Sequence, residues 1–208
     1  MKNVVLIGFG KSATTTLNNA LSSVGYNSFH HDIRSNPLSK LVYESYYKNN
    51  DPYLVFDKYS PFALTQIDTL FPELSLDIFP QLDYDLLSKG FENESVSYIL
   101  NYRDPDKLVQ SFARWKNGDY MSRLIKSDLK GLPAGYGKNK EELILWINNH
   151  YSKCRSLFSH SDRFIEVDIE SKYFKETVES FLGVNFNSWG MYNKNIQIDS
   201  TMSKIKYI

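Results

Sequence analysis

The sequence predicts an α/β protein with three layers, in which helices cover both faces of a central parallel sheet of about five strands. Short apolar runs rich in β-branched residues alternate along the chain with longer segments of helical periodicity. Glycine, proline or a capping residue stands at most of the boundaries between them. The chain has 208 residues, enough to bury a core, and we expect residues 1–208 to form a single domain.

The expected strands cover residues 4–7, 26–31, 53–56, 96–101 and 163–167. The expected helices cover residues 13–24, 37–48, a segment opened by Pro61, 104–115, 140–158 and 170–182. Residues 72–90 are expected to form an irregular insertion with one short helix, and the tail from 184 to be irregular. Four glycines and Pro133 in the stretch 117–139 predict a mobile lid or substrate loop.

Three polar clusters follow directly on expected strands, at residues 8–16, 57–58 and 101–103. The carboxyl ends of parallel strands meet at one edge of the sheet, and ligands of such folds bind there. We therefore expect these three clusters to gather around one site.

Composition narrows the class of protein. Lysine plus arginine and aspartate plus glutamate both number 24, so the chain has no basic excess and general nucleic-acid binding is not expected. Cys154 is the only cysteine, which excludes an internal disulfide bond. The apolar run after Met1 is too short for a signal peptide or a membrane span, so we expect a cytoplasmic protein without membrane insertion. The oligomeric state is left open.

The segment after the first strand has the features of an anion site. Gly8 and Gly10 allow a tight turn, and the helix that follows offers free N–H groups and the positive end of its dipole. Lys11 adds a cation and Thr14 to Thr16 add hydroxyl donors. A Walker A loop needs a glycine five positions before Gly10, where Val5 stands instead.

The run Lys11-Ser12-Ala13-Thr14-Thr15-Thr16-Leu17 resembles the 5′-phosphosulfate loop of the PAPS-dependent sulfotransferases, where PAPS is 3′-phosphoadenosine 5′-phosphosulfate. Ala13 stands where that family usually has glycine. The resemblance implies a P-loop-like, nucleotide-kinase-like fold. It also implies that Gly10 and residues 11–16 bind the nucleotide: Lys11, Ser12, Ala13, Thr14, Thr15 and Thr16.

A second segment, Asn101-Tyr102-Arg103-Asp104-Pro105 with Ser111 beyond it, resembles the 3′-phosphate site of the same family. There the arginine and the serine hold the 3′-phosphate, which suits the charge-assisted bonds of a guanidinium. The alternative is that Arg103 pairs with Asp104 or Asp106 at a solvated helix start. Residues 163–168 and 181–184 also resemble the closing strand and helix of the family.

Residues 56–61 are similar to the acidic-Lys-Ser/Thr-Pro segment of carbohydrate sulfotransferases, whose lysine reaches the active site. The resemblance thus nominates Lys58 to steady the transferring sulfate. The family's glycine-rich Arg-Lys-Gly segment is absent. Residues 131–140, with Tyr136, Lys138 and Lys140, are one candidate for covering the nucleotide instead.

The resemblance implies transfer of a sulfuryl group from PAPS to a hydroxyl or amine of a small-molecule, sugar or lipid acceptor, with release of PAP and no required metal. Lys11 is expected to meet the charge on the leaving oxygen. As the base, His31 is favoured over His30, with Asp32 and Asp57 as rivals. Adjacent residues of an extended chain do not converge on one ion, so His30, His31 and Asp32 are not expected to bind a metal.

Two alternatives remain open at this point. One is a nucleotide or small-molecule kinase with a degenerate phosphate loop, which would bind ATP with Mg²⁺. The other is a catalytically inactive PAP-binding module. The acceptor is expected to contact loops 34–52, 72–95 and 117–139, whose aromatic residues include Tyr43, Tyr46, Tyr47, Phe79, Tyr84 and Tyr120.

Overall fold

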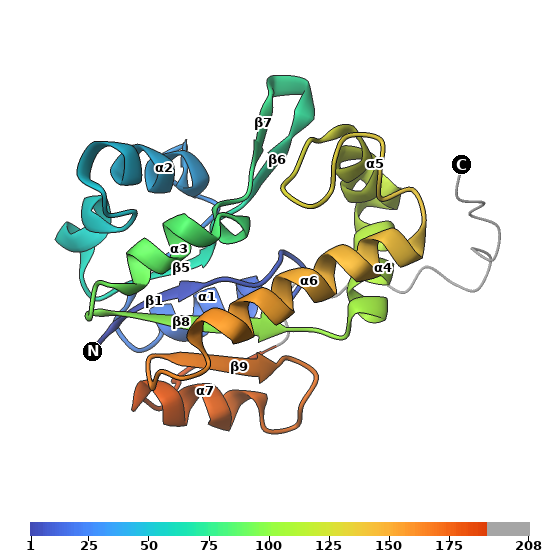
Figure 1. Ribbon diagram of the computed structural model, residues 1–208. Coiled ribbons are helices and arrows are strands. Elements are labelled where there is room, and N and C mark those ends of the chain that lie inside the picture. Colours follow the sequence, from blue (N-terminus) through green and yellow to red (C-terminus); the bar gives the residue numbers. More distant parts are fainter. Residues whose placement is uncertain (191–208) are drawn as a thin grey trace.

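The computed structural model describes residues 1–190, and these include a central sheet of five strands (Figure 1). The strands are β1 (Asn3–Leu6), β2 (Asn27–His30), β5 (Phe62–Gln66), β8 (Val96–Tyr102) and β9 (Phe164–Asp168). Their order is β2-β5-β1-β8-β9, and every neighbouring pair is parallel. Residues 184–190 are irregular, as expected, and the rest of the tail lies outside the described residues.

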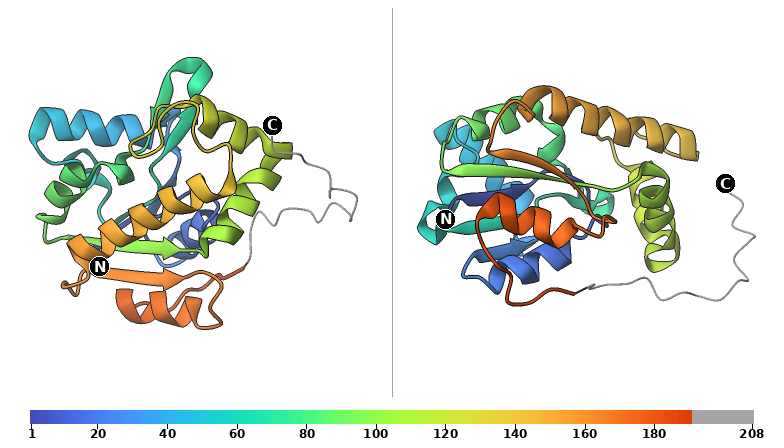
Figure 2. Two further views of the ribbon diagram at one scale, coloured as in Figure 1. Left: turned by 45° about the vertical axis from the view of Figure 1, so that its right-hand side comes forward. Right: turned by 90° about the horizontal axis from the view of Figure 1, so that it is seen from below.

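Helices cover both faces of this sheet (Figure 2). On one face lie α1 (Thr14–Ser22) and α7 (Phe174–Leu182), and on the other α3 (Tyr84–Phe91) and α6 (Lys140–Phe158). The remaining helices are α2 (Leu38–Asn49), α4 (Pro105–Arg114) and α5 (Asp119–Lys126). The expected three-layer α/β/α fold is thereby confirmed.

Strand β1 shows how the sequence builds the two cores. Successive side chains of a strand face opposite sides of the sheet. Val4 and Leu6 accordingly pack with α1 and α7, whereas Val5 and Ile7 belong to the larger core under α3 and α6. A strand buried on both faces reads as one continuous apolar run, which is why this element is predictable from sequence.

The expectations for residues 53–66 are wrong. Residues Leu54–Tyr59 form a 3₁₀ segment, η1, and the segment opened by Pro61 is the strand β5 instead of a helix. All five β5 side chains are buried, because this strand pairs with β1 on one side and β2 on the other. The backbone N–H of Phe62 bonds to the side chain of Asn3, so η1 lies at the amino-terminal edge of the sheet.

Two stretches expected to be irregular contain regular elements. Residues 69–82 hold the hairpin β6 (Thr69–Phe71) and β7 (Leu76–Ile78), with the 3₁₀ turns η2 (Pro72–Leu74) and η3 (Pro80–Leu82). Residues 115–126 hold η4 (Trp115–Gly118) and then α5, so the expectation of a loop throughout residues 117–139 is wrong. The mobility expected of that stretch stays a prediction. A second small hairpin pairs β3 (Asp32–Ile33) with β4 (Asn36–Pro37).

Within residues 1–190, no helix combines the length and apolar character needed to cross a membrane.

Candidate functional site

A cavity of about 1650 Å³ lies beyond the carboxyl ends of the strands. All five strands of the sheet contribute to its wall through the residues at or just after their ends, which include Gly10, His31, Gln66, Arg103 and Ile169. Helices α4, α5 and α7 supply further lining residues. The topology therefore brings together segments that lie up to 180 residues apart in the chain, from Gly10 to Gly190, as parallel α/β folds do at this edge.

The loop after β1 is shaped from both ends by one amide side chain. The backbone N–H of Gly8 donates to Oδ1 of Asn101 at 3.0 Å, and Nδ2 of Asn101 donates to the carbonyl of Ser12 at 2.8 Å. A Cβ on Gly8 would stand 2.5 Å from that same Oδ1, so glycine is required there. Lys11 and Ala13 have positive φ angles of 65° and 59°. Ala13 thus adopts at the N-cap of α1 the conformation that glycine favours.

Lys11 and Arg103 lie on one wall of the cavity. Nη1 of Arg103 donates to the backbone carbonyl of Lys11 at 2.9 Å, which fixes the guanidinium against the loop. Burial, and next the positive charge of Arg103, lower the pKa of Lys11. Two cations held this close are most stable with an anion between them.

The alternative partners of Arg103 are occupied elsewhere. Asp104 caps α4 by accepting from the N–H of Lys107, and Asp106 pairs with Lys140. Nε of Arg103 instead contacts Glu170 at 3.4 Å, and Glu170 also pairs with Lys107. The structure therefore contradicts the alternative of a simple pair between Arg103 and Asp104 or Asp106.

Ser111 lies in α4 and faces the same cavity as Arg103, with its side chain largely buried. Ser12, by contrast, is fully buried, and its hydroxyl lies beside Tyr151 instead of lining the cavity. The side chain of Ser12 therefore supports the loop from beneath. Ala13 and the three threonines Thr14, Thr15 and Thr16 all line the cavity.

His30 belongs to a chain of hydrogen bonds that ends on a buried carboxylate. Thr14 Oγ1 donates to Gln66 Oε1 at 3.1 Å, so its contact of 3.1 Å with His30 Nε2 requires the imidazole to donate. Gln66 in turn donates to Asp68 at 3.2 Å. Burial, and then the neighbouring His31, lower the pKa of His30 to about 3. His30 is therefore neutral near pH 7 and acts as a donor to the loop, which does not suit a base.

Asp68 is a candidate that the sequence reasoning missed. It lines the cavity two residues after β5, is 3% exposed and accepts a second amide bond from Gln81 at 3.3 Å. Burial raises its pKa, and the nearby His31 opposes that shift. The signal was present, because Asp68 is a polar residue that follows a strand. Sequence reasoning misses Asp68 because it assigns the segment of that strand, β5, to a helix.

Asp57 and Lys58 are not at this site. Both lie in η1, at the opposite edge of the sheet, and neither lines the cavity. Nζ of Lys58 rests 5.2 Å from the ring centre of Tyr59. The resemblance of residues 56–61 nominates Lys58, but the strand expected to end at Phe56 and carry both residues to the site does not exist.

Residues 131–140 do not cover the cavity either. Tyr136 is 57% exposed, Glu142 accepts from the N–H groups of Gly137 and Lys138, and Lys140 pairs with Asp106. The cavity wall beyond Arg103 comes instead from the segment after β9, which includes Lys172, Phe174 and Lys175, and from Trp189. Trp189 packs edge-on against Phe174 at 4.9 Å between ring centres.

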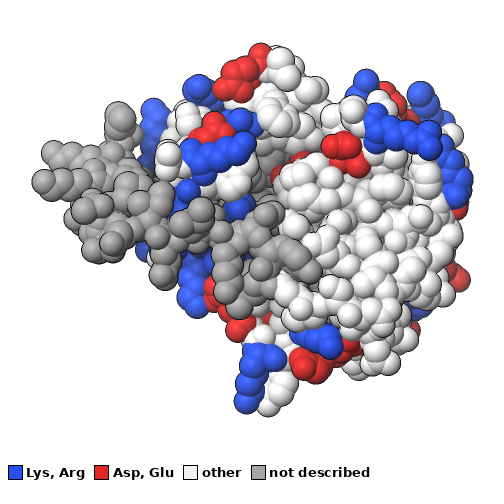
Figure 3. Space-filling view, turned by 180° about the vertical axis from the view of Figure 1, so that it is seen from behind, with Lys and Arg blue, Asp and Glu red and all other residues white. Residues whose placement is uncertain are grey.

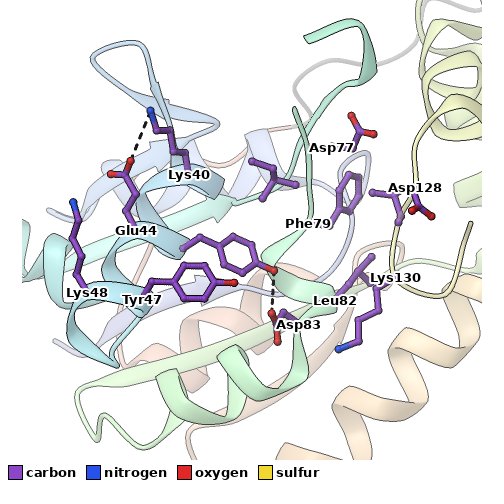
Figure 4. Close-up of a pocket in the computed structure, with 13 residues that line it drawn as sticks. Lys40, Glu44, Tyr47, Lys48, Asp77, Phe79, Leu82, Asp83, Asp128 and Lys130 are labelled. Carbon is purple, nitrogen blue, oxygen red and sulfur yellow. Dashed lines mark hydrogen bonds and ion pairs between the residues drawn. The ribbon is translucent and has the colours of Figure 1, made fainter. Parts of the chain in front are cut away.

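A second cavity of about 620 Å³ lies between α2, the β7 strand and the segment 128–130 (Figure 4). Tyr43, Tyr47 and Phe79, three of the aromatic residues expected to contact the acceptor, line this second cavity. Tyr120 lines the larger one. The aromatic residues of the three loops therefore divide between two places instead of forming one acceptor surface.

Charge is unevenly distributed over the surface. Seven lysine and arginine residues line the larger cavity, against four aspartate and glutamate residues. In the view from behind, basic side chains gather at the left and upper right, around a broad uncharged area in the centre and lower right (Figure 3). The chain as a whole has no net charge, so this excess is a local property of the cavity.

Comparison with known proteins shows the family of the chain. The sequence matches the family described as "Sulfotransferase domain" over residues 3–189, and the chain belongs to that family. Among solved structures, it is similar to the sulfotransferase domain from the Synechococcus PCC 7002 olefin synthase, with a TM-score of 0.41 and 13% identity. That similarity covers 90% of this chain and 76% of the other. No curated protein matches the chain.

Proposed function

We propose that this protein transfers a sulfuryl group from PAPS to an acceptor hydroxyl and releases PAP. The observation that carries the proposal is the bond between Arg103 and the carbonyl of Lys11, at 2.9 Å. It holds the residues that resemble the 5′-phosphosulfate loop and the 3′-phosphate site on one wall of one cavity. A nucleotide with phosphate groups at both ends of its ribose needs two anion sites at such a short separation.

The residues of the cavity fit such a nucleotide. The backbone of residues 10–16 and the hydroxyls of Thr14 to Thr16 would hold the 5′-phosphosulfate, at the start of α1 where the helix dipole is positive. Arg103 and Ser111 would hold the 3′-phosphate. Phe174 and Trp189 offer flat apolar surface beside these groups for the adenine. PAPS supplies the sulfuryl group, and the protein supplies position and charge.

Lys11 is placed to meet negative charge on the oxygen that leaves with PAP. Burial and the neighbouring Arg103 lower its pKa, and a phosphosulfate bound beside it would favour the charged form. Fixed charges in a partly desolvated site stabilise developing charge without reorganisation. Transfer of a sulfuryl group, which has fewer negative charges than a phosphoryl group, places less demand on a metal ion.

His31 and Asp68 together are the best candidates for the base that accepts the proton of the acceptor. Both line the cavity, and His31 is close enough to affect the pKa of Asp68. Burial raises that pKa, which makes the Asp68 carboxylate a better proton acceptor than an exposed one. His30 suits this role less, because burial lowers its pKa and its Nε2 donates to Thr14, and Asp32 lines the same cavity as a more exposed rival.

Calorimetric titration with PAP, and separately with ATP plus Mg²⁺, tests the nucleotide site. The wild-type protein should bind PAP and not ATP, and Arg103→Ala should weaken PAP binding by about 100-fold, because it removes a charge-assisted contact from a partly buried site. Lys48→Ala, in the second cavity, is the matched control and should bind PAP normally. Binding of ATP–Mg²⁺ but not PAP would show that the protein is a kinase. Release of PAP from labelled PAPS then separates an enzyme from an inactive module.

A further inference from the structure

Three cations surround the indole of Trp115 in the larger cavity. Nζ of Lys116 lies 4.6 Å from the ring centre, the guanidinium carbon of Arg123 5.9 Å and Nζ of Lys11 6.0 Å. All four residues line the cavity. Trp115, Lys116 and Arg123 are not among the residues proposed to hold the nucleotide, and the ammonium of Lys11 reaches toward Trp115, so this part of the cavity is left for the acceptor.

Arg123 is fixed in place by four neighbours. Nη1 donates to the carbonyl of Leu70 at 3.1 Å, Nη2 pairs with Asp119 at 2.9 Å, and the guanidinium stacks on Phe71 at 4.8 Å as well as facing Trp115. Its Nε is buried without an acceptor among residues 1–190. Because that Nε has almost no accessible surface, the donors left for a ligand are the second N–H groups of Nη1 and Nη2.

Lys116 is presented to the cavity by an unusual backbone. Lys116 and Asn117 have consecutive positive φ angles, 44° and 57°, which only a well-supported turn maintains in residues other than glycine. Among the described residues, no carboxylate lies within ion-pair distance of its ammonium. Asp119 offsets the charge of Arg123 alone, so this end of the cavity keeps an excess of positive charge beside the apolar side chains of Leu70 and Phe71.

We infer that the acceptor carries an anionic group next to a flat apolar part, and that Lys116 and Arg123 bind this anion while Trp115 and Phe71 contact the apolar part. The inference rests on the proposed function, since it assigns the other half of the cavity to PAP. It adds the substrate class: an aromatic or similarly flat molecule that bears a carboxylate or sulfonate as well as the hydroxyl to be sulfated. Charge-assisted bonds and cation–π contacts together give such a site its selectivity.

Binding of matched probes to the PAP-saturated protein tests this inference, with fluorescence of the tryptophans and calorimetry as readouts. 4-Hydroxyphenylacetate and its neutral amide differ only in the charge. We expect the carboxylate to bind about tenfold more tightly, and raised salt to weaken its binding and not that of the amide. 4-Hydroxybenzenesulfonate, as a third probe, shows which anionic group is preferred.

Lys116→Gln and Arg123→Gln should each reduce the preference for the charged probes, and neither should change PAP affinity. Lys116 is exposed, so its replacement tests the idea even if Arg123→Gln lowers stability. Lys126→Gln is the matched control on α5, because Lys126 lies outside the cavity. Equal binding of charged and neutral probes, or binding of none of them, overturns the inference. Failure of PAP itself to bind would instead reject the proposed function.

Discussion

The two cavities of this protein differ in the balance of their charged side chains and in how far those side chains contact one another. In the larger cavity, lysine and arginine outnumber aspartate and glutamate seven to four, whereas in the smaller one they are outnumbered three to four. Charges of the smaller cavity also satisfy one another: Lys40 lies 3.7 Å from Glu44, and Tyr43 donates to Asp83 at 3.1 Å (Figure 4). The larger cavity leaves cations without such partners, so it is the better receptor for a multiply charged anion.

The two cavities also differ in the structural elements that form their walls. The larger one is built on strand ends and on the loop fixed by Asn101, whereas the smaller one is bounded by the surface helix α2, a hairpin strand and a loop segment. Elements tied into a parallel sheet position side chains more accurately than surface loops do. The comparison teaches that strand topology, more than the number of aromatic residues, indicates where the candidate site of this fold lies.

The largest difference between the two cavities is expected when Lys11, in the loop after β1, is replaced. Lys11→Ala should reduce sulfuryl transfer about 1000-fold, since it removes the fixed charge that meets the leaving oxygen. Steady-state release of PAP measures the effect, and Lys48→Ala in the smaller cavity should leave the rate unchanged. Comparable losses from both variants would end the distinction between the cavities.

Replacement of the buried carboxylate comes next in size. Asp68→Asn keeps the shape of the residue but does not accept a proton, and we expect the transfer rate to fall about 100-fold while PAP affinity is retained. In the wild-type protein the rate should rise with pH through the raised pKa of Asp68, and the variant should lose this limb. An unaltered pH–rate profile in Asp68→Asn would reject Asp68 as the base and leave His31 and Asp32 as candidates.

Part of the loss of folding stability at acid pH should come from His30, which lines the larger cavity. The pKa of His30 is lowered to about 3 in the folded protein, whereas a histidine in the unfolded chain titrates near about 6.5. Between these values the unfolded chain binds the proton first. The free energy of unfolding therefore falls as pH falls through this window, by at most about 1.4 kcal/mol per pH unit for this residue.

His30→Gln can still donate to Thr14 and should make the free energy of unfolding less dependent on pH between 7 and 5, as measured by urea denaturation. Some dependence should remain, because burial lowers the pKa of His150 to about 4 in the same direction. An identical pH dependence in the variant and the wild-type protein would contradict the assignment to His30.

The smallest expected effect concerns Ala13, which has a φ of 59°. Ala13→Gly relieves the left-handed strain but increases the freedom of the unfolded chain, so the free energy of unfolding should change by less than about 1 kcal/mol. Ala13→Val should lower it by about 2 kcal/mol, because a β-branched residue tolerates this conformation poorly. Denaturation with urea measures both, and equal stability of the two variants would contradict the backbone geometry at this position.

Most of the fold and half of the site could be predicted because the signals were local. A continuous apolar run predicts β1, and the polar loop and α1 follow from glycine spacing and helical periodicity. The place of Arg103 follows in the same way, because Val96 to Leu100 is mostly apolar and Asp104-Pro105 begins α4, whereas its role comes from the resemblance.

The missing part of the site depends on contacts distant in sequence. Tyr53 to Phe56 is apolar enough for a strand, yet what decides is that Phe62 to Gln66 pairs with two other strands. Short apolar runs do not distinguish strand from turn or helix by themselves. This one misplacement removed Gln66 and Asp68 from the expected site and put Asp57 and Lys58 into it. The turn that holds Lys116 over Trp115 is likewise set by tertiary packing.

The position of Asn101 has a consequence for the order in which this chain acquires its binding loop during synthesis. The loop at residues 8–12 leaves the ribosome early, but the side chain that bonds both of its ends comes 89 residues after Ser12. The amide of Asn101 supplies the acceptor and the donor of these two bonds from two separate atoms. A nascent chain therefore emerges before its most recognisable motif can be fixed, and the loop is held at both ends only once β8 pairs with β1.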